Sequence, residues 1–300
     1  MYNRLLIAVD GSDEATHAAR YGLELADIVG AAVDLVYVIP RRSLQMTRTE
    51  RERTRLRERG NDILAAAAEL ADSDTSVETH LAEGTPAAEI SSLAGDRNAD
   101  LLVVGRQGMT GVGRRFLGGV TERVLARGEV PICVVPLGES VPTAADCDRL
   151  LVPTDGSDNA AAAVPHAAAL ATASGSAVDV LNVVDLQAAG GPFNAGELDT
   201  AFIERLDARG ADAVEAIADE IADAAPEISV DTAVKRMTDI NGAAAGIRAY
   251  VEANEIDLVV MGSHGRSNLR RGLLGSVASV VLQTVDIPVV VVKQGSEDSE

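Results

Sequence analysis

The stretch RLLIAVDGS at residues 4–12 returns as RLLVPTDGS at residues 149–157, so a strand-like apolar run ending in Asp-Gly-Ser occurs twice. Three more stretches recur in the same order: AVDLV at 32–36 as AVDVL at 177–181, DLLVVG at 100–105 as DLVVMG at 257–262, and PICVV at 131–135 as PVVVV at 288–292. Four matches in one order indicate two tandem copies of a single domain. The displacement grows from 145 to 157 residues, which places 12 extra residues between the second and fourth strands of the second copy.

The repeat sets the expected domain organisation. The copies are expected to cover residues 1–137 and 148–293, with a linker at 138–147 and an acidic tail at 294–300. Small and polar residues and Pro fill the linker, as is typical of a connection between domains. A chain of 300 residues is long enough for two domains that each close a core.

Each copy alternates short apolar runs with helical stretches. The runs lie at 4–9, 32–39, 77–81, 101–104 and 131–135 of the first copy and at 150–153, 177–184, 228–234, 258–261 and 288–292 of the second. Helical patterns lie between the runs of the first copy at 13–29, 46–70, 86–93 and 117–127. Strands joined by helices form right-handed βαβ units. We therefore expect an α/β fold with two tandem doubly wound, Rossmann-like domains, each with five parallel strands covered by helices on both faces.

The last strand of each copy is rich in Val and should lie at a sheet edge. An edge strand presents unpaired backbone groups that invite pairing with another strand. The two last strands are therefore expected to pair with each other across a pseudo-twofold axis, which would make the tandem an intramolecular dimer. A further homodimer of the whole chain is compatible with the same pattern.

Composition limits the partners and the compartment. A net charge of −20 and a pI near 4.5 argue against nucleic acid or an anionic membrane as the partner. The acidity and the scarcity of Lys suggest a salt-accumulating microbe, although an acidic protein from a GC-rich genome would look similar. No apolar run is long enough to span a bilayer and no signal-peptide pattern precedes the first strand, so a cytoplasmic protein is expected.

A glycine-bearing loop follows the fourth strand of each copy. The second copy has Gly262 and Gly265, nine further residues, and then Gly275-Ser276; the first has Gly105, Gly108 and Gly118-Gly119 in the same spacing. Glycines allow backbone N–H groups to approach an anion, and the following helix start adds a positive partial charge. Ser276 is expected at the N-cap. A tight strand-to-helix turn without a ligand is the alternative reading.

Two arginine pairs support the phosphate-binding interpretation. Arg114-Arg115 and Arg270-Arg271 lie inside the two glycine loops, where they would place cations beside the phosphate groups.

An aspartate follows the first strand of each copy. Asp10 and Asp155 are each followed by Gly-Ser, at the strand end where open α/β sheets bind ligands. Either carboxylate is placed to reach the sugar hydroxyls of a nucleotide. The alternative is that Asp or Ser only caps the next helix.

Three weaker patterns remain. His264 lies in the second glycine loop, although a lone loop histidine is more often a plain surface residue. Ser157, His166 and Asp155 contain the residue types of a hydrolase triad, but nothing around them resembles a nucleophile elbow. Residues 41–59 hold eight Arg against three Glu, a local net charge of +5, whereas the corresponding region near 197–227 is acidic. This basic stretch is either a solvated helix or a surface that attracts the acidic one or an acidic partner.

The combined pattern resembles the universal stress protein family: strand-Asp-Gly-Ser, the glycine loop with its fixed spacing, a helix and a Val-rich strand. The resemblance covers both copies and implies the fold of adenine nucleotide alpha hydrolases. ATP-binding members of that family use the first-strand Asp, backbone near the end of the second strand, and the glycine loop with its Ser. The resemblance therefore implies nucleotide-binding residues at Asp155, Val183, Gly262, Gly265, Gly275 and Ser276, and at Asp10, Val38, Gly105, Gly108, Gly118 and Thr121.

Each copy departs once from the family pattern. Gly119 replaces the Ser of the first loop, and Ala278 replaces the hydroxyl residue that Thr121 supplies in the first copy. One missing hydrogen bond lowers affinity several-fold, by about 1 kcal/mol. The second copy is expected to bind better.

The resemblance implies a stress-response sensor or regulator that binds ATP, with Mg²⁺ as a companion of the triphosphate and an unknown regulatory protein as a partner. No Walker-type lysine or arginine finger is evident, so little or no catalysis is expected beyond weak ATP hydrolysis. A pseudo-dimeric scaffold that has lost nucleotide binding and a slow ATPase are the alternatives.

Overall fold

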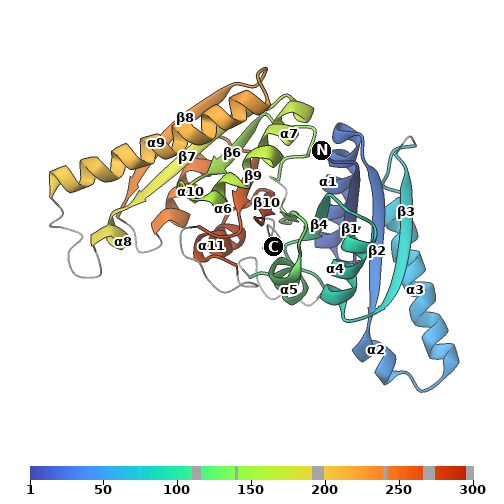
Figure 1. Cartoon of the computed structure of the whole chain (residues 1–300). Coiled ribbons are helices and arrows are strands. Elements are labelled where there is room, and N and C mark those ends of the chain that lie inside the picture. Colours follow the sequence, from blue (N-terminus) through green and yellow to red (C-terminus); the bar gives the residue numbers. More distant parts are fainter. Residues whose placement is uncertain are drawn as a thin grey trace, which may run out of the picture. The chain divides into compact units, whose positions relative to one another are not determined.

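A computed structural model describes residues 1–73, 75–109, 116–138, 141–190, 199–238, 242–265 and 274–294. The chain divides into two compact units, Met1–Ala145 and Asp146–Glu300, and each is described by itself (Figure 1). The predicted pairing of the two last strands stays a prediction. No helix among these residues is long and apolar enough to cross a membrane.

Unit 1 is built from five strands and the helices between them. Its described elements are β1 (Arg4–Ala8), α1 (Asp13–Val29), β2 (Ala32–Pro40), α2 (Arg41–Met46), α3 (Glu50–Ala68), β3 (Val77–Gly84), α4 (Pro86–Asp96), β4 (Leu101–Gly105), α5 (Gly119–Arg127) and β5 (Ile132–Val135). All neighbouring strands are parallel, in the order β3-β2-β1-β4-β5. The five-stranded doubly wound sheet expected from the sequence is confirmed.

Unit 2 repeats this arrangement. Its described elements are β6 (Arg149–Pro153), α6 (Asp158–Ala161), α7 (Val164–Ser174), β7 (Ala177–Asp185), α8 (Leu186–Gly190), α9 (Thr200–Ala224), β8 (Val230–Met237), α10 (Gly242–Ala253), β9 (Leu258–Gly262), α11 (Ser276–Thr284) and β10 (Val289–Val292). The parallel order is β8-β7-β6-β9-β10. The chain order reverses at β6, which lies between β7 and β9, so the carboxyl ends of these three strands face a crevice.

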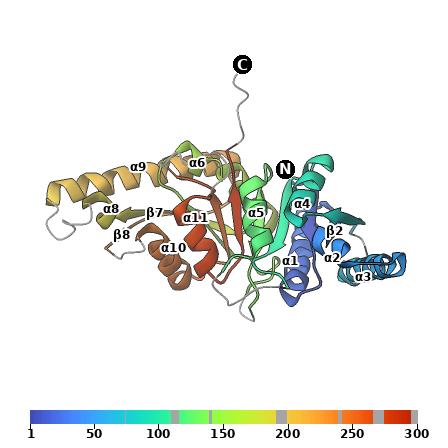
Figure 2. The ribbon, with the colours of Figure 1, turned by 90° about the horizontal axis from the view of Figure 1, so that it is seen from below.

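Helices cover both faces of each sheet. In unit 2, α7 packs against α9 on one face, and α10 packs against α11 on the other. Figures 1 and 2 both show α10 beside α11. In unit 1, α4 and α5 are the corresponding pair. The central strands are buried on both sides; Leu5, Leu6 and Ile7 of β1 are 0% exposed. This explains why these runs lack the alternation of half-buried strands.

Capping residues determine where several helices begin. Ser12 and Ser157 cap α1 and α6 by accepting a hydrogen bond from the backbone N–H three residues on. Thr49 and Glu52 form a capping box at the start of α3, so the helix expected at 46–70 begins at Glu50 and ends at Ala68, and residues 47–49 separate it from the short helix α2. Sequence periodicity alone had not resolved this break.

A buried carboxylate forms the centre of an ionic cluster in unit 1. Asp34 of β2 is 0% exposed and accepts hydrogen bonds from Arg4, His80 and Arg97 at 2.7 to 3.1 Å. Burial by itself raises the pKa of Asp34, but the hydrogen bonds from Arg97, His80 and Arg4 outweigh it, so this pKa lies below its usual value. Glu78 also contacts Arg97. The cluster joins β1, β2, β3 and the end of α4.

We expect Asp34→Asn to lower the free energy of unfolding of unit 1 at pH 7 by roughly 2 kcal/mol, since it leaves part-buried arginines without their partner. A carboxylate with a lowered folded-state pKa stabilises above its unfolded-state pKa, and this contribution is lost as the pH falls through the folded-state value. Asp34→Asn should therefore flatten the acid side of the stability profile below about pH 4. Denaturant unfolding between pH 3 and 7 measures this, with the exposed Asp62→Asn as the control. Equal acid sensitivity of all three proteins would contradict the expectation.

Candidate functional site

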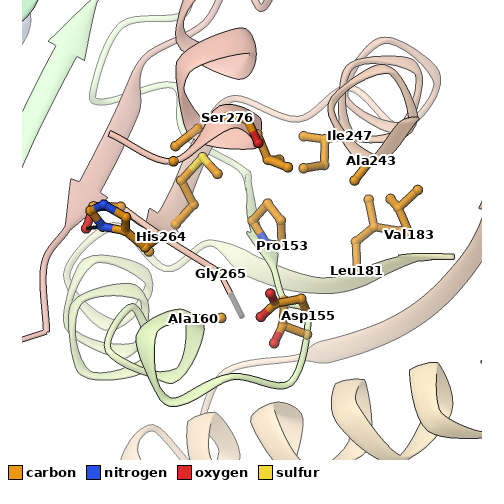
Figure 3. A pocket seen from close by; sticks show the side chains of 17 residues that line it. Pro153, Asp155, Ala160, Leu181, Val183, Ala243, Ile247, His264, Gly265 and Ser276 are labelled. Carbon is orange, nitrogen blue, oxygen red and sulfur yellow. Dashed lines mark hydrogen bonds between the residues drawn. The ribbon is translucent and has the colours of Figure 1, made fainter. Parts of the chain in front are cut away.

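A cavity of about 290 Å³ opens in unit 2 at the carboxyl ends of β6, β7 and β9. All six residues that the sequence assigned to the second copy line it: Asp155, Val183, Gly262, Gly265, Gly275 and Ser276. In Figure 3, Ser276 and Asp155 lie on opposite sides of the opening, with Leu181 and Val183 between them on a third side. The structure therefore brings these residues together around one space.

The cavity has an apolar wall that the sequence analysis did not identify. Pro153 of β6, Leu181 of β7, Met261 of β9, and Ala243 and Ile247 of α10 form it (Figure 3). An aliphatic slot of this kind suits a flat, largely apolar group such as a nucleobase. The α10 residues come from a helix without a motif, so only a structure could assign them.

Asp155 lines the cavity and also takes part in the turn that precedes α6. Its Oδ1 accepts hydrogen bonds from the Ser157 backbone N–H at 3.0 Å and from Ser157 Oγ at 2.6 Å. Ser157 in turn caps α6. Asp155 thus fixes the turn after β6 and also borders the cavity. Because the Ser157 hydroxyl donates to Asp155 and serves as the helix cap, its geometry gives no support to the Ser157–His166–Asp155 triad.

The glycines of the loop are required by the packing of the loop itself. A Cβ on Gly262 would lie 2.2 Å from the Asn159 carbonyl oxygen of α6, and one on Gly265 would lie 2.3 Å from Asp155 Oδ2. A Cβ on Gly275 would lie 3.0 Å from the Ser263 carbonyl oxygen. This steric requirement differs from the expected role of the glycines, which was to let an anion approach the backbone. The Gly275 N–H is already used, because it donates to Ser263 O at 2.9 Å.

The start of α11 borders the cavity and has no side-chain cap. Gly275 is the N-cap and makes no side-chain capping bond, and Ser276 is the first helical residue, so its predicted N-cap position is wrong by one residue. Ser276, Val277 and Ala278 line the cavity. The first intrahelical bond is from Ser279 N–H to Gly275 O, so the preceding amides need an outside acceptor. An uncapped helix start of this kind favours an anion.

His264 is more buried than a plain surface residue. Its Nδ1 lies 3.0 Å from Ser263 Oγ, and its buried Nε2 has no hydrogen-bond partner among the residues that the structure describes. It lines the cavity next to Gly265. A buried ring nitrogen without a partner is available to a ligand that enters the cavity.

Unit 1 brings the corresponding residues together around Asp10. Asp10 Oδ1 accepts from Ser12 N–H at 3.0 Å and Ser12 Oγ at 2.5 Å, and its Oδ2 accepts from Met109 N–H at 3.0 Å. A Cβ on Gly108 would lie 2.4 Å from Asp10 Oδ2. The glycine loop of unit 1 thus closes directly onto the carboxylate, as in unit 2.

The remaining unit 1 candidates lie around the same loop. Gly118 is the N-cap of α5, its N–H donates to Arg106 O, and Gly119 begins the helix. Thr121 is buried and its hydroxyl donates to the Gly105 carbonyl at 2.9 Å, so that hydroxyl is engaged inside the unit. Val38 lies in β2, two residues before its end.

Two further groups of charged residues have to be placed. The arginine pairs Arg114-Arg115 and Arg270-Arg271 lie outside the described residues. Among the residues described, Asp34, Glu78 and His80 form a group with the geometry to hold a metal ion. Both oxygens of Asp34 already accept hydrogen bonds from Arg97, so the group is satisfied as an ion-pair cluster.

The family model described as "Universal stress protein family" matches residues 1–136 and 147–293, which is almost the whole chain. The chain belongs to the universal stress protein family. It is 34% identical over 140 residues to a universal stress protein of Methanocaldococcus jannaschii, a match that covers 45% of this chain and 82% of that one. It is 27% identical over 307 residues to a universal stress protein of Mycobacterium bovis, covering 97% of both chains.

A solved structure supports the tandem fold. The crystal structure of a universal stress protein from Archaeoglobus fulgidus matches with a TM-score of 0.72 and 21% identity, over 98% of this chain and 100% of that chain. At this level of identity the likeness concerns the fold. The family and the two-domain organisation seen in the sequence therefore agree with full-length relatives.

Proposed function

We propose that unit 2 binds an adenine nucleotide, ATP in the first instance, and that this universal stress protein acts as a nucleotide-dependent regulator. The observation that carries the proposal is the cavity whose three parts match the three parts of a nucleotide. An apolar slot, a carboxylate and an uncapped helix start border one space of about 290 Å³.

The base occupies the slot between Leu181 and Ile247, where aliphatic side chains bury its faces. The ribose hydroxyls donate to the Asp155 carboxylate, which lines the cavity and also holds the turn after β6. The phosphates accept from the amides at the start of α11 and from Ser276 Oγ. Mg²⁺ accompanies the triphosphate as its counter-ion and neutralises part of its charge.

The lining residues provide recognition and no evident means of rapid hydrolysis. No lysine or arginine of the described residues lines this cavity, and Asp155 is tied to its own turn. Phosphoryl transfer needs cations on the transferred group and a base or orienting residue for water. The function is therefore nucleotide sensing with little or no turnover, in a cytoplasmic stress response.

Unit 1 is the weaker site. Gly119 provides no hydroxyl where unit 2 has Ser276. A chain with two unequal sites would respond to nucleotide over a wider concentration range than one with two equal sites. The regulatory partner that reads this state is a second protein of unknown identity.

We expect the purified protein to release an adenine nucleotide on denaturation and to bind Mg·ATP in calorimetry. Ser276→Ala should weaken ATP binding about fivefold, the loss of roughly 1 kcal/mol for one hydrogen bond. Ser279→Ala is the matched control, because Ser279 lies in the same helix and does not line the cavity. No released nucleotide and no binding of Mg·ATP would remove the proposal and leave an interaction scaffold.

A further inference from the structure

A second hollow lies beside the nucleotide cavity of unit 2. It has a volume of about 210 Å³ and lies among the end of β7, α8 and α9. Asp155 and Val183 line both spaces, so the two are neighbours across the position where the proposed ligand has its ribose. No role is assigned to this hollow by the family pattern.

Arg209 of α9 is the cation of the hollow. Its guanidinium has no ion pair among the described residues, although the chain carries a net charge of −20. The two carboxylates of the hollow are already hydrogen bonded. Asp155 accepts from Ser157, and Asp185 accepts from the Ala188 N–H at 2.9 Å. Arg209 is the positively charged residue of this lining, and its side chain is exposed, so its guanidinium can reach an anion that enters the hollow beside these two carboxylates.

An arginine occupies the same position of the corresponding helix in both units. Arg59-Gly60 in α3 and Arg209-Gly210 in α9 are each followed by Asp two residues later. A Cβ on Gly60 would lie 2.9 Å from the Tyr37 ring, and one on Gly210 would lie 2.7 Å from Asn182 Oδ1. The glycine thus brings each helix close to the second strand of its sheet.

An inverted ion pair confirms that the two helices are equivalent. Three residues before the glycine, Arg57 of α3 contacts Glu83 of β3 at 2.7 Å. At the same place in unit 2 the charges are exchanged, and Asp207 of α9 contacts Arg236 of β8. The two insert helices otherwise differ in charge, yet each keeps the Arg-Gly pair beside the ribose position.

We infer that the hollow of unit 2 is an anion subsite in which Arg209 binds a phosphate carried on the 2′ or 3′ oxygen of the ribose. The inference rests on the proposed function, which places the ribose at Asp155. A substituent on either ribose oxygen then enters the space that Asp155 shares with Arg209. A guanidinium binds a phosphate through charge-assisted, bidentate hydrogen bonds. The preferred ligand class is an adenine nucleotide phosphorylated on its ribose as well as at its 5′ position.

Unit 1 should lack this preference. Tyr37 stands where unit 2 has Asn182, and its ring lies against Gly60. Ile63 also packs toward Gly11, with its Cδ1 3.0 Å from the position of a Cβ there, whereas unit 2 has Ala213 at the corresponding place. These larger side chains occupy the region of unit 1 that corresponds to the hollow.

The test is calorimetric titration of the full chain at constant ionic strength with AMP, adenosine 2′,5′-bisphosphate and adenosine 3′,5′-bisphosphate. Wild-type protein should bind at least one of these two bisphosphates about tenfold more tightly than it binds AMP. Arg209→Gln should abolish this preference and leave AMP affinity within about twofold of wild type. Arg205→Gln should keep the preference, because Arg205 lies one turn earlier in α9, over the Phe202 ring, and does not line the hollow.

The outcomes separate this inference from the proposed function. AMP binding with no preference for either bisphosphate would overturn the subsite while the nucleotide site stands. A preference that survives Arg209→Gln but is lost in Arg59→Gln would overturn its assignment to unit 2. No binding of any adenine nucleotide would remove the proposed function and the subsite together.

Discussion

Ala243→Phe is expected to weaken ATP binding by unit 2 about a hundredfold, a loss near 2.7 kcal/mol. Ala243 lies in α10 on the apolar wall of the cavity, half-buried, with its methyl group toward the opening (Figure 3). A phenyl ring at this position fills the slot that the base needs. Because the space is empty of protein, the larger side chain should be accommodated without disturbing the core. Calorimetry with Mg·ATP measures the effect.

Ala249→Phe is the matched control for this variant. Ala249 lies in the same helix but is exposed and does not line the cavity. It should therefore bind ATP as the wild type does, and both variants should keep the wild-type melting temperature. Full ATP affinity in Ala243→Phe would show that the base does not occupy this slot and would count against the proposed function.

The fold could be predicted from the sequence because each local signal agreed with the next. The central strand runs are buried on both faces, and the ends of the strands fall within a few residues of the expected positions. Because the domain occurs twice, each predicted helix or strand could also be compared with its counterpart in the other copy. The break between α2 and α3 was missed because it depends on the Thr49–Glu52 capping box within a continuous run of polar residues.

The candidate site could be predicted only where a motif marks it. Asp155 and the loop glycines follow strand ends, so topology alone places them in one crevice. The apolar wall of the cavity belongs to ordinary apolar patterns of the sequence; its residues include Leu181, Ala243 and Ile247. Packing between helices and strands determines which of these side chains face the cavity. Arg209 lies in the region near 197–227, which the sequence analysis described only as acidic. The Arg-Gly pair that the two insert helices share was a signal that an internal alignment could have found.

Gly262→Ala is expected to destabilise unit 2 by about 3 kcal/mol, the upper part of the range for an overpacked core. Its new Cβ would lie 2.2 Å from the carbonyl oxygen of Asn159 and 3.1 Å from Ala160 Cα. Both are backbone atoms of α6, which cannot rotate away as a side chain can. Either β9 or α6 must shift, and the turn that holds Asp155 shifts with α6. Hydrogen exchange of unit 2 peptides measures the loss separately from unit 1.

The steric account predicts a graded series. Gly105→Ala in unit 1 meets Gln107 O at 3.0 Å and should cost only about 1 kcal/mol. Gly95→Ala meets nothing within 4 Å, lies in α4, and should stabilise unit 1 by roughly 0.5 kcal/mol. Equal effects at Gly262 and Gly95 would contradict the close contact of β9 with α6. If the series holds, the loss of ATP binding in a Gly262 variant results from a displaced α6. The loss of ATP binding in Ala243→Phe, with an unchanged melting temperature, then results from the filled cavity.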